Sequence, residues 1–270
     1  MKADIVANTL SKISGLFARP DYRVGAALSG GGARGFAHIG VLQALNEAGV
    51  KPDIVAGVSA GAVASVFYAA GIPFPDMIRA FADVKFSNLA ELGVPKDGFF
   101  KLDRFGDFLS RNIPYDRLED LPVKTVICAT DIDRGEAVVF EEGPLAECVL
   151  ASCSIPIVFK PRVINGTRYV DGGVLHNLPA WAIRERCRTL YGVNVSPADK
   201  SGKRPKGTIL DMATASFKLM AKTNAVPDML LCDHVIQVQD IAHYNVFNLR
   251  EVEKIYTLGY QATKRMLKQL

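Results

Sequence analysis

From residue 22 onward, continuous apolar runs alternate with segments whose apolar residues recur at helical spacing. The runs "YRVGAALS" and "DIVAGVS" predict two buried strands, and residues 33–48 and 60–70 predict the helices that follow them. Gly49 ends the first helix, and Gly71 with Pro73 ends the second. This alternation is typical of a parallel sheet covered by helices, so we expect an α/β fold that opens with a βαβα unit.

Strands and helices of the same kind follow in the second half of the chain. Apolar runs predict strands at "VKTVICATDI", "EAVVF", "RTLYGVNVS" and "HVIQVQ", and helical spacing predicts helices near residues 144–152, 208–222 and 249–269. The pair Asn165-Gly166 within "RVINGTRYV" predicts a hairpin. We expect one domain over residues 1–270, with a core at about 22–195 and a C-terminal strand and helix extension at about 208–270.

Two further segments frame this core. Residues 72–120 are rich in Phe, Asp, Lys and Pro, and we interpret them as an insertion that covers something rather than as a separate domain. Residues 1–19 carry four apolar side chains at helical spacing, Val6, Leu10, Ile13 and Phe17. They predict an amphipathic helix that docks on the protein's own core or, as the alternative, lies on a membrane surface.

The composition is that of an ordinary globular protein. Of 270 residues, 49% are hydrophobic and 22% are charged, and the net charge of +4 is too small to indicate nucleic-acid binding. There is no run of 18 apolar residues, no secretory signal at the start and no CxxC pair among the five cysteines. We therefore expect a cytoplasmic protein with reduced thiols, able to contact the inner membrane face peripherally, and we expect no metal or cofactor.

The glycine-rich stretch "ALSGGGARGFAHIG" follows the first predicted strand directly. Its Gly30, Gly32 and Gly35 satisfy the pattern G-x-G-x-x-G of dinucleotide-binding proteins. That pattern also needs an acidic residue at the end of the second strand, whereas Asp53 stands at its start. A phosphate-binding P-loop would need Lys and then Ser or Thr, and the chain has Ala33-Arg34-Gly35 instead. Neither nucleotide interpretation is completed by its partner residues.

The stretch "GVSAG" offers a different interpretation, because it is G-x-S-x-G at a strand-to-helix junction. There Ser59 would sit on a sharp turn with its hydroxyl above the sheet, while Gly57 and Gly61 leave room for helix and strand to pack closely. Both glycine segments would end adjacent parallel strands, so the glycine-loop amides could face the oxyanion formed when Ser59 attacks an acyl carbonyl. Arg34 could orient that loop, meet an anionic substrate group or be purely structural.

A serine nucleophile needs a base, and the chain offers several candidates. Of the four histidines, His38 lies inside the first predicted helix and His176 lies near "DGG", where it could approach the site. His234 and His243 fall late in the chain, outside any motif-like loop, although their positions do not exclude a serine-acid-histidine triad. Asp171 in "YVDGG" ends an apolar hairpin strand and is followed by Gly172 and Gly173 on a tight turn. Its alternative role is an Asx turn.

The ordered set GGGARG, GVSAG and DGG, with "ASCSIPIVFKP" before the last, resembles the bacterial patatin-like phospholipases over residues 22–195. The resemblance implies a modified α/β-hydrolase-like, mostly parallel sheet flanked by helices. It implies a dyad of Ser59 as nucleophile and Asp171 as base, without a catalytic histidine. The implied oxyanion hole is Gly30, Gly31 and Gly32, and the supporting motif residues are Arg34, Gly35, Gly57, Gly61, Gly172 and Gly173.

The leading hypothesis is a cofactor-free serine hydrolase of lipid acyl esters, such as phospholipids or lysophospholipids. An acyltransferase with the same nucleophile, and a catalytically silent module that binds lipid or nucleotide, are the alternatives. Residues 1–19 and 72–100 are the candidate membrane contacts, and oligomeric state stays open. In "ASCSIPIVFKP", four apolar side chains could line an acyl-chain pocket or pack beneath the site, namely Ile155, Ile157, Val158 and Phe159.

Overall fold

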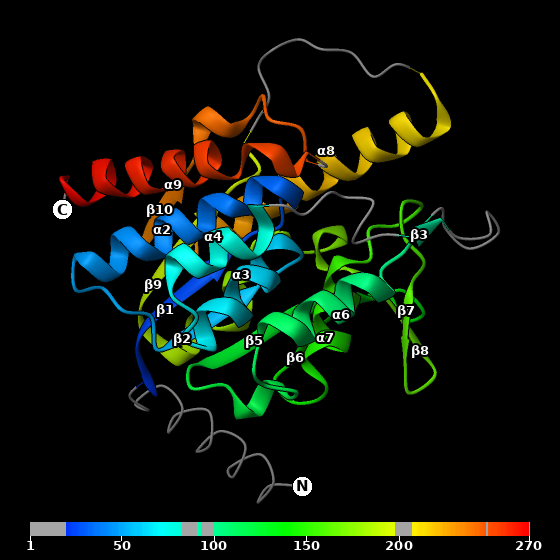
Figure 1. Ribbon diagram of the computed structural model, residues 1–270, viewed down its shortest axis with the longest axis horizontal. Coiled ribbons are helices and arrows are strands. Elements are labelled where there is room, and N and C mark those ends of the chain that lie inside the picture. The colour runs from blue at the N-terminus through cyan, green and yellow to red at the C-terminus, as the bar shows by residue number, and fades with distance from the viewer. Residues whose placement is uncertain (1–19, 83–90, 93–99, 198–206, 247, 270) are drawn as a thin grey trace, which may run out of the picture.

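The computed structural model describes residues 20–82, 91–92, 100–197, 207–246 and 248–269. The amphipathic helix predicted at residues 1–19 therefore lies outside the described residues. Within the described ranges, eight strands form one sheet in the order β10-β9-β1-β2-β5-β8-β7, and β6 pairs with β5 (Figure 1). Their bounds are β1 Tyr22–Leu28, β2 Ile54–Gly57, β5 Lys124–Asp131, β6 Glu136–Phe140, β7 Arg162–Ile164, β8 Thr167–Asp171, β9 Cys187–Asn194 and β10 His234–Gln237.

The sheet is parallel in the half that carries the glycine motifs and antiparallel in the rest. Strands β10, β9, β1, β2 and β5 run parallel, and Leu28 at the end of β1 is in register with Gly57 at the end of β2. The predicted hairpin is present, because β7 and β8 are antiparallel around Asn165 and Gly166. Strands β5, β6 and β8 add the other antiparallel pairs. The prediction of a mostly parallel sheet is therefore confirmed, with antiparallel strands added along one side. A separate short pair joins β3 Glu91–Leu92 to β4 Phe100–Lys101.

The helices follow the predicted order, with differences at their ends. The α-helices are α2 Phe36–Glu47, α3 Ala60–Ala69, α4 Phe74–Ala82, α6 Asp103–Asn112, α7 Leu145–Cys153, α8 Ile209–Met229 and α9 Val252–Leu267. The 3₁₀ turns are η1 Gly32–Gly35, η2 Leu118–Asp120, η3 Gly172–Val174, η4 Pro179–Ala182, η5 Arg184–Arg186, η6 Gln239–Ile241 and η7 Leu249–Glu251. The glycine loop thus enters α2 through a 3₁₀ turn, and α8 continues beyond residue 222, where the predicted helix ends.

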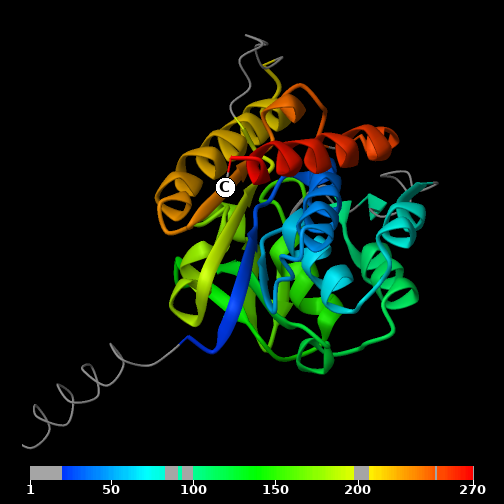
Figure 2. The same ribbon diagram turned by 90° about the vertical axis from the view of Figure 1, so that its left-hand side faces the viewer.

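The core has two layers, one on each face of the sheet. Alternate residues of β1 point to opposite faces, as strand geometry requires, so Ala26 and Leu28 join one layer while Ala27 joins the other. The larger layer packs under α2, α3, α4, α6, α7 and α9. The smaller layer packs under η4 and α8. In Figure 2, α2, α4 and α6 lie to the right of the strands and α8 to the upper left.

Helix α9 crosses α2 at a contact made by two glycines. A Cβ atom on Gly40 would lie 2.1 Å from the Tyr256 carbonyl oxygen, and one on Gly259 would lie 2.1 Å from the Ala37 carbonyl oxygen. The two helices therefore approach until their backbones touch, with α9 lying along α2 in Figure 1. The C-terminal helix is thereby built into the core layer that carries the glycine loop.

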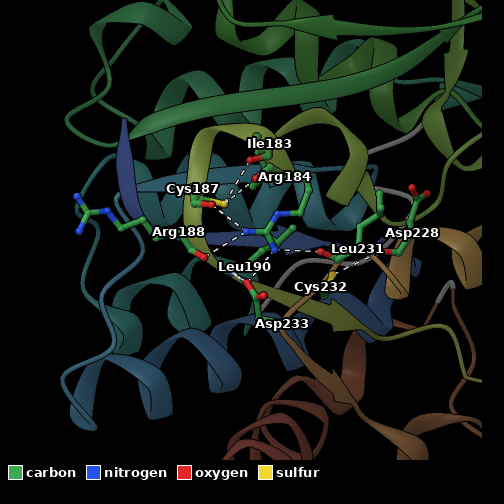
Figure 3. A network of polar contacts seen from close by, with 9 residues as sticks. All are labelled: Ile183, Arg184, Cys187, Arg188, Leu190, Asp228, Leu231, Cys232 and Asp233. Atoms are coloured by element: carbon green, nitrogen blue, oxygen red, sulfur yellow. Dashed lines mark hydrogen bonds and ion pairs between the residues drawn. The ribbon is translucent and has the colours of Figure 1, made fainter. Parts of the chain in front are cut away.

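Arg184 fastens the other part of the C-terminal extension to the sheet (Figure 3). Its guanidinium donates to the Leu231 carbonyl at 3.0 Å and to Asp233 Oδ2 at 2.7 Å. The same group donates to the Cys187 carbonyl at 2.8 Å, and Asp233 also accepts from the Leu190 N–H. The turn before β10 is thus tied to the start of β9, which aligns the two strands for pairing.

Candidate active site

Ser59 occupies the tight turn between β2 and α3. Its φ of 54° and ψ of −120° lie in a region that side-chain-bearing residues rarely adopt, which indicates a strained backbone. The turn is held from outside, because the Ser59 N–H donates to Ser152 Oγ at 2.8 Å and the Ser152 hydroxyl donates to the Cys128 carbonyl at 2.6 Å. Sequence reasoning missed Ser152, whose only signal is its place in "ASCS" on α7.

The glycines around Ser59 have the packing role predicted for them. A Cβ atom on Gly57 would lie 2.4 Å from the Gly61 carbonyl oxygen, and one on Gly61 would lie 2.0 Å from the Leu28 carbonyl oxygen. A Cβ atom on Gly35 would lie 2.5 Å from the Ala60 Cβ atom. Helix α3 can therefore start directly against β1 and the glycine loop only without these side chains.

Of the three glycine-loop amides predicted as oxyanion donors, two have no acceptor among the described residues. The Gly30 N–H donates to the Asn177 carbonyl at 3.0 Å, so it is already engaged. No described residue accepts a hydrogen bond from the N–H of Gly31 or Gly32. Gly32 has a φ of +56°, and a Cβ atom there would lie 2.4 Å from the Val246 carbonyl oxygen. The set of candidate donors narrows to Gly31 and Gly32, because Asn177 occupies the Gly30 amide.

The Gly30 carbonyl is fixed as firmly as its amide. It accepts from Ser196 Oγ at 2.8 Å and from Ser29 Oγ at 3.1 Å. Asn177, which binds the Gly30 N–H, receives its own backbone hydrogen bond from α8, since its N–H donates to Asn224 Oδ1 at 2.9 Å. These hydrogen bonds engage both backbone polar groups of Gly30, an arrangement that fits a preorganised oxyanion hole.

Arg34 connects the glycine loop to the C-terminal extension. Its side chain is buried, its Nε donates to the Tyr244 carbonyl at 3.0 Å, and its Nη2 donates to the Ala242 carbonyl. The Ala33 N–H adds a hydrogen bond to the Val246 carbonyl at 2.8 Å. Of the roles considered for Arg34, orienting the glycine loop agrees with these contacts. The guanidinium links the loop to the carbonyls of residues 242 and 244.

Asp171 ends β8 at the side of Ser59. Its Oδ1 accepts from the Gly173 N–H at 2.8 Å, so the Asx turn weighed as an alternative is present. Its Oδ2 is buried and has no hydrogen-bond partner among the described residues. Burial raises the pKa of Asp171 from its usual 3.8 to about 7, and the Gly173 N–H and the nearby Ser59 hydroxyl partly oppose this effect.

The turn after Asp171 lies tightly against its neighbours. A Cβ atom on Gly172 would lie 2.7 Å from the Cys128 carbonyl oxygen, and one on Gly173 would lie 3.0 Å from Asp171 Oδ1. Asn224 Nδ2 of α8 donates to the Gly173 carbonyl at 2.9 Å and to the Val174 carbonyl at 3.2 Å. Asn224 therefore contacts both the acid turn and, through Asn177, the glycine loop. Sequence reasoning missed it, because it lies where the predicted helix had already ended.

The four histidines, all of them in the described ranges, are engaged away from Ser59. His38 is fully buried, its Nε2 donates to the Ser29 carbonyl at 2.8 Å, and burial lowers its pKa to about 4. His176 Nδ1 is 2.9 Å from Asp228 Oδ2. The rings of His234 and His243 pack on Tyr191 and Tyr244. None of the four lines the pocket at Ser59.

An apolar pocket of about 140 Å³ opens at Ser59 and Gly32. Engineered apolar cavities of roughly this size accept benzene, so the space suits a segment of hydrocarbon. Its further lining comes from the glycine loop, α2, α3, α4, α6 with the residue before it, the end of α7 with the loop after it, and the C-terminal extension: Ala33, Gly35, Phe36, Ile39, Ala60, Val63, Ala64, Phe67, Met77, Phe81, Leu102, Phe105, Cys153, Ile155, Phe159, Val246 and Leu249.

The residues that line the pocket bear on two predictions, one about the apolar side chains of "ASCSIPIVFKP" and one about residues 72–120. Of the apolar side chains in "ASCSIPIVFKP", Ile155 and Phe159 line it, while Ile157 is exposed and Val158 packs elsewhere. The segment predicted to be an insertion that covers something contributes Met77, Phe81 and Phe105 to the pocket wall. The expected membrane contact of this segment falls largely outside the described residues, and its described Phe74 and Phe100 pack inward on the core and on Phe159.

Asp53 accepts from the N–H groups of Val24 and Arg23, so it caps the start of β1 rather than reaching toward a ribose. No group of three or more His, Cys, Asp or Glu side chains in the described ranges is arranged to hold a metal ion. Among the described helices, none combines the length and apolar character needed to cross a bilayer.

Comparisons with known proteins agree with this geometry. The model of the patatin-like phospholipase family matches residues 26–183. An uncharacterized NTE family protein of Mycobacterium tuberculosis is 36% identical over 159 residues, which are 58% of this chain and 44% of that protein. Lysophospholipase NTE1 of Saccharomyces cerevisiae is 30% identical over 267 residues, which are 87% of this chain and 16% of that protein. The chain thus spans less than half the length of both relatives.

A solved structure shares the fold. The crystal structure of VipD from Legionella pneumophila superposes with a TM-score of 0.51 and 14% sequence identity, covering 93% of this chain and 68% of that one. The family match spans both the Ser59 turn and the Asp171 turn and covers more than half of the residues. The chain belongs to the patatin-like phospholipase family.

Proposed function

We propose that this chain is a serine hydrolase that cleaves acyl esters of phospholipids or lysophospholipids with Ser59 as nucleophile and Asp171 as base. The observation that carries the proposal is one arrangement of side chains. A strained serine lies at an apolar pocket, beside a buried carboxylate whose Oδ2 has no hydrogen-bond partner in the described residues. Such an unpaired buried oxygen is costly for stability alone, which supports a role in chemistry.

In the first half-reaction, Ser59 Oγ attacks the acyl carbonyl carbon while Asp171 Oδ2 takes the hydroxyl proton. The carbonyl oxygen becomes an oxyanion, which then re-forms the double bond and expels the alcohol oxygen of the lipid. That oxygen recovers the proton from Asp171, and an acyl–Ser59 ester remains. Water then attacks this ester, Asp171 takes its proton, and the fatty acid leaves as Ser59 Oγ is protonated again.

The basicity of Asp171 suits this role. A general base works best when its pKa lies near the working pH, and burial brings the pKa of Asp171 to about 7. His38 suits it poorly, because its Nε2 is bonded to the Ser29 carbonyl and burial lowers its pKa to about 4. The Ser59–Asp171 contact is expected to shorten when substrate binds, as catalytic hydrogen bonds often do.

The oxyanion is stabilised by the backbone N–H groups of Gly31 and Gly32, which have no acceptor in the described residues. Donors of this kind contribute about 2.7–4 kcal/mol each to transition-state stabilisation. Helix α3 begins at Ala60, so its N-terminal dipole adds a partial positive charge beside the reacting group.

The substrate class follows from the pocket and from the relatives. The side chains that line the pocket are apolar apart from Ser59 and the Cys153 thiol. This lining suits an acyl chain whose carbonyl lies at Ser59. The yeast relative is named a lysophospholipase, and the matching family is named for phospholipases. Together these observations support an acyl ester of a phospholipid or lysophospholipid as substrate.

The test compares initial rates on a short-chain ester and on a lysophospholipid for six variants. We expect Ser59→Ala and Asp171→Asn each to lose at least about three orders of magnitude in kcat, because each removes a group that reacts in the transition state. The matched controls are His38→Gln, His176→Gln, His234→Gln and His243→Gln. These should keep substantial turnover, with circular dichroism confirming that every variant folds.

Two results would reject parts of the proposal. Full activity of folded Ser59→Ala would remove the serine mechanism altogether. A single histidine variant that falls to the level of Asp171→Asn would replace the dyad with a serine-acid-histidine triad. Labelling of the wild type, but not of Ser59→Ala, by a fluorophosphonate separates an enzyme from a binding module.

A further inference from the structure

Helix α8 exposes an apolar stripe to solvent. Of the eleven large hydrophobic residues that are exposed in the described ranges, seven lie between residues 209 and 231. We call six of them the outer face of α8: Ile209, Met212, Leu219, Met220, Val226 and Leu230. Their spacing of three, four or seven residues places them along one side of a helix, with Met220 beside Leu219. Single exposed hydrophobic residues are common on proteins, whereas a contiguous row indicates a binding surface.

The extent of exposure is large within this stripe. Ile209 is 84% exposed, Leu230 is 83% exposed and Leu219 is 64% exposed. The helix has 21 residues, so the stripe is about 30 Å long. Figure 1 shows the start of α8 extending from the body of the molecule at the upper right. Nothing in the described part of the chain covers these side chains.

Lysines lie beside the middle of the stripe. Lys218 and Lys222 are exposed on the same helix, one turn apart, and Lys222 lies one turn from Leu219. Of the two carboxylates of α8, Asp228 is buried and contacts His176, while Asp211 accepts from the Thr208 hydroxyl in the first turn of the helix. Lysine stems can lie along apolar surface while their ammonium groups reach anionic headgroups. The face therefore complements a negatively charged lipid surface.

The residue types favour lipid over protein as the occupant. Protein interfaces are enriched in aromatic residues, Met and Arg and depleted in Lys. The outer face of α8 shares two Met side chains with that pattern, but its other members are aliphatic, it is flanked by lysines, and it has no aromatic residue or arginine among its members. An apolar stripe bordered by cations is the pattern of a helix that lies in the plane of a membrane interface.

Asn224, one turn after Met220, connects α8 to the candidate active site. Its Nδ2 donates to the Gly173 and Val174 carbonyls, directly after Asp171. If the outer face lies in the headgroup region, the acid turn is held within about one helix diameter, roughly 10 Å, of the lipid. The helix would then dock the protein and position the catalytic turn at the same time.

We propose that the outer face of α8 is the surface by which this protein binds an anionic lipid bilayer. The proposed function supplies the reason for such binding, since a lipid hydrolase must reach substrate at an interface. The binding itself does not need catalysis. The predicted contacts at residues 1–19 and 72–100 are separate segments, so α8 adds a surface that the apolar pattern alone did not indicate.

The experiment is co-sedimentation of the full chain with phosphatidylcholine vesicles that contain or lack phosphatidylglycerol. The wild type should bind the anionic vesicles and bind the neutral ones weakly. The double variant Leu219→Gln/Leu230→Gln should lower the partition coefficient by about tenfold or more, because two apolar side chains lose their burial in lipid. Lys218→Gln/Lys222→Gln should lower it by about thirtyfold on anionic vesicles, since each lysine near the surface contributes about 1 kcal/mol.

The matched control is Ile132→Gln/Val163→Gln, which removes two exposed aliphatic side chains outside α8 and should bind as the wild type does. Thermal unfolding verifies that each variant is folded. Unchanged binding of Leu219→Gln/Leu230→Gln, equal loss in the control, or no binding by the wild type would each overturn the proposal. So would a wild-type dimer in sedimentation velocity that the α8 variant dissociates without altering vesicle binding.

One further variant separates this proposal from the proposed function. Ser59→Ala should bind vesicles as the wild type does, because Ser59 lies in the pocket and not on the outer face of α8. If hydrolysis is absent from the wild type while α8-dependent binding persists, the proposed function fails and the docking surface stands. If the wild type hydrolyses a soluble short-chain ester but does not bind vesicles, the docking surface fails and the proposed function stands.

Discussion

At the scale of single residues, burial sets the chemistry of the candidate site. Asp171 and His38 are both almost fully buried, and each is pushed toward its neutral form. For His38 the neutral form is already dominant at neutral pH, so burial only secures a structural hydrogen bond. For Asp171 the same effect moves the pKa to about 7, where the carboxyl group can gain and lose a proton during a reaction.

This shift predicts the pH dependence of activity. Asp171 can accept the Ser59 proton only when ionised, so kcat/KM on a soluble ester should be constant at alkaline pH. Below about pH 7 it should fall about tenfold per pH unit, as the protonated carboxyl group accumulates in the free enzyme. The measurement is a pH–rate profile from about pH 5 to about pH 9. A profile that stays flat down to about pH 5 would contradict Asp171 as the base.

The raised pKa of Asp171 also predicts how the free energy of unfolding depends on pH. Because the folded pKa of Asp171 lies above its unfolded value, the native state binds the proton more tightly. This contribution to stability is full below the usual pKa of 3.8 and is lost as pH rises through about 7. Asp171→Asn removes the ionisation, so it should stabilise the protein more at about pH 8 than at about pH 5, as thermal unfolding would measure.

At the scale of elements, α8 joins parts of the site that are distant in the chain. The predicted helix stops at residue 222, yet α8 continues to Met229. The added turns carry Asn224, whose amide bonds the Gly173 and Val174 carbonyls and the Asn177 N–H. Asn177 in turn accepts from Gly30. One side chain of α8 thus sets the distance between the acid turn and the glycine loop.

Asn224→Ala should therefore act mainly on turnover. We expect kcat on a short-chain ester to fall about tenfold to a hundredfold with little change in KM, because misplacement of reacting groups affects the transition state most. The matched control is Thr223→Ala, whose hydroxyl bonds only the Leu219 carbonyl of its own helix. Equal kinetics for the two variants, or a rise in KM alone, would show that Asn224 does not position the site.

At the scale of the whole molecule, the C-terminal extension is part of the fold that holds the site. Strand β10 pairs with β9, Arg34 holds residues 242–244, and α9 crosses α2 with backbone contact at Gly40 and Gly259. The glycine loop lies at the start of α2, so a shift of α9 would be transmitted to it. We propose that residues 22–269 unfold as one unit.

Gly259→Ala tests this coupling. The added Cβ would lie 2.1 Å from the Ala37 carbonyl oxygen, and backbone on both sides leaves no flexible atom to yield. We expect a loss of about 1–3 kcal/mol in stability and a lower Tm in a single calorimetric transition. The control is Gly106→Ala in α6, where the Cβ meets only the Leu150 side chain at 3.2 Å and alanine favours the helix. Two separate transitions, with only one shifted, would argue against a single unit.

The sequence by itself determined the features that depend on neighbouring residues. Apolar runs and helical spacing located the βαβα unit, the Asn165-Gly166 pair located the hairpin, and the glycines of "GVSAG" predicted the close packing around Ser59. These predictions hold because strand, helix and turn preferences are set within a few residues. The position of Ser59 on the turn and of Asp171 at a strand end follows from the same local patterns.

Only the tertiary structure decided which of these groups meet. The Gly30 amide is engaged by Asn177, and Arg34 binds carbonyls more than 200 residues away, so neither outcome has a local signal. Ile157 turns out to solvent at a φ of 70° while Ile155 and Phe159 enter the pocket, although all three are equally apolar. Hydrogen bonds and packing between distant segments satisfy buried groups wherever the folded chain brings partners together, and that placement is a property of the whole fold.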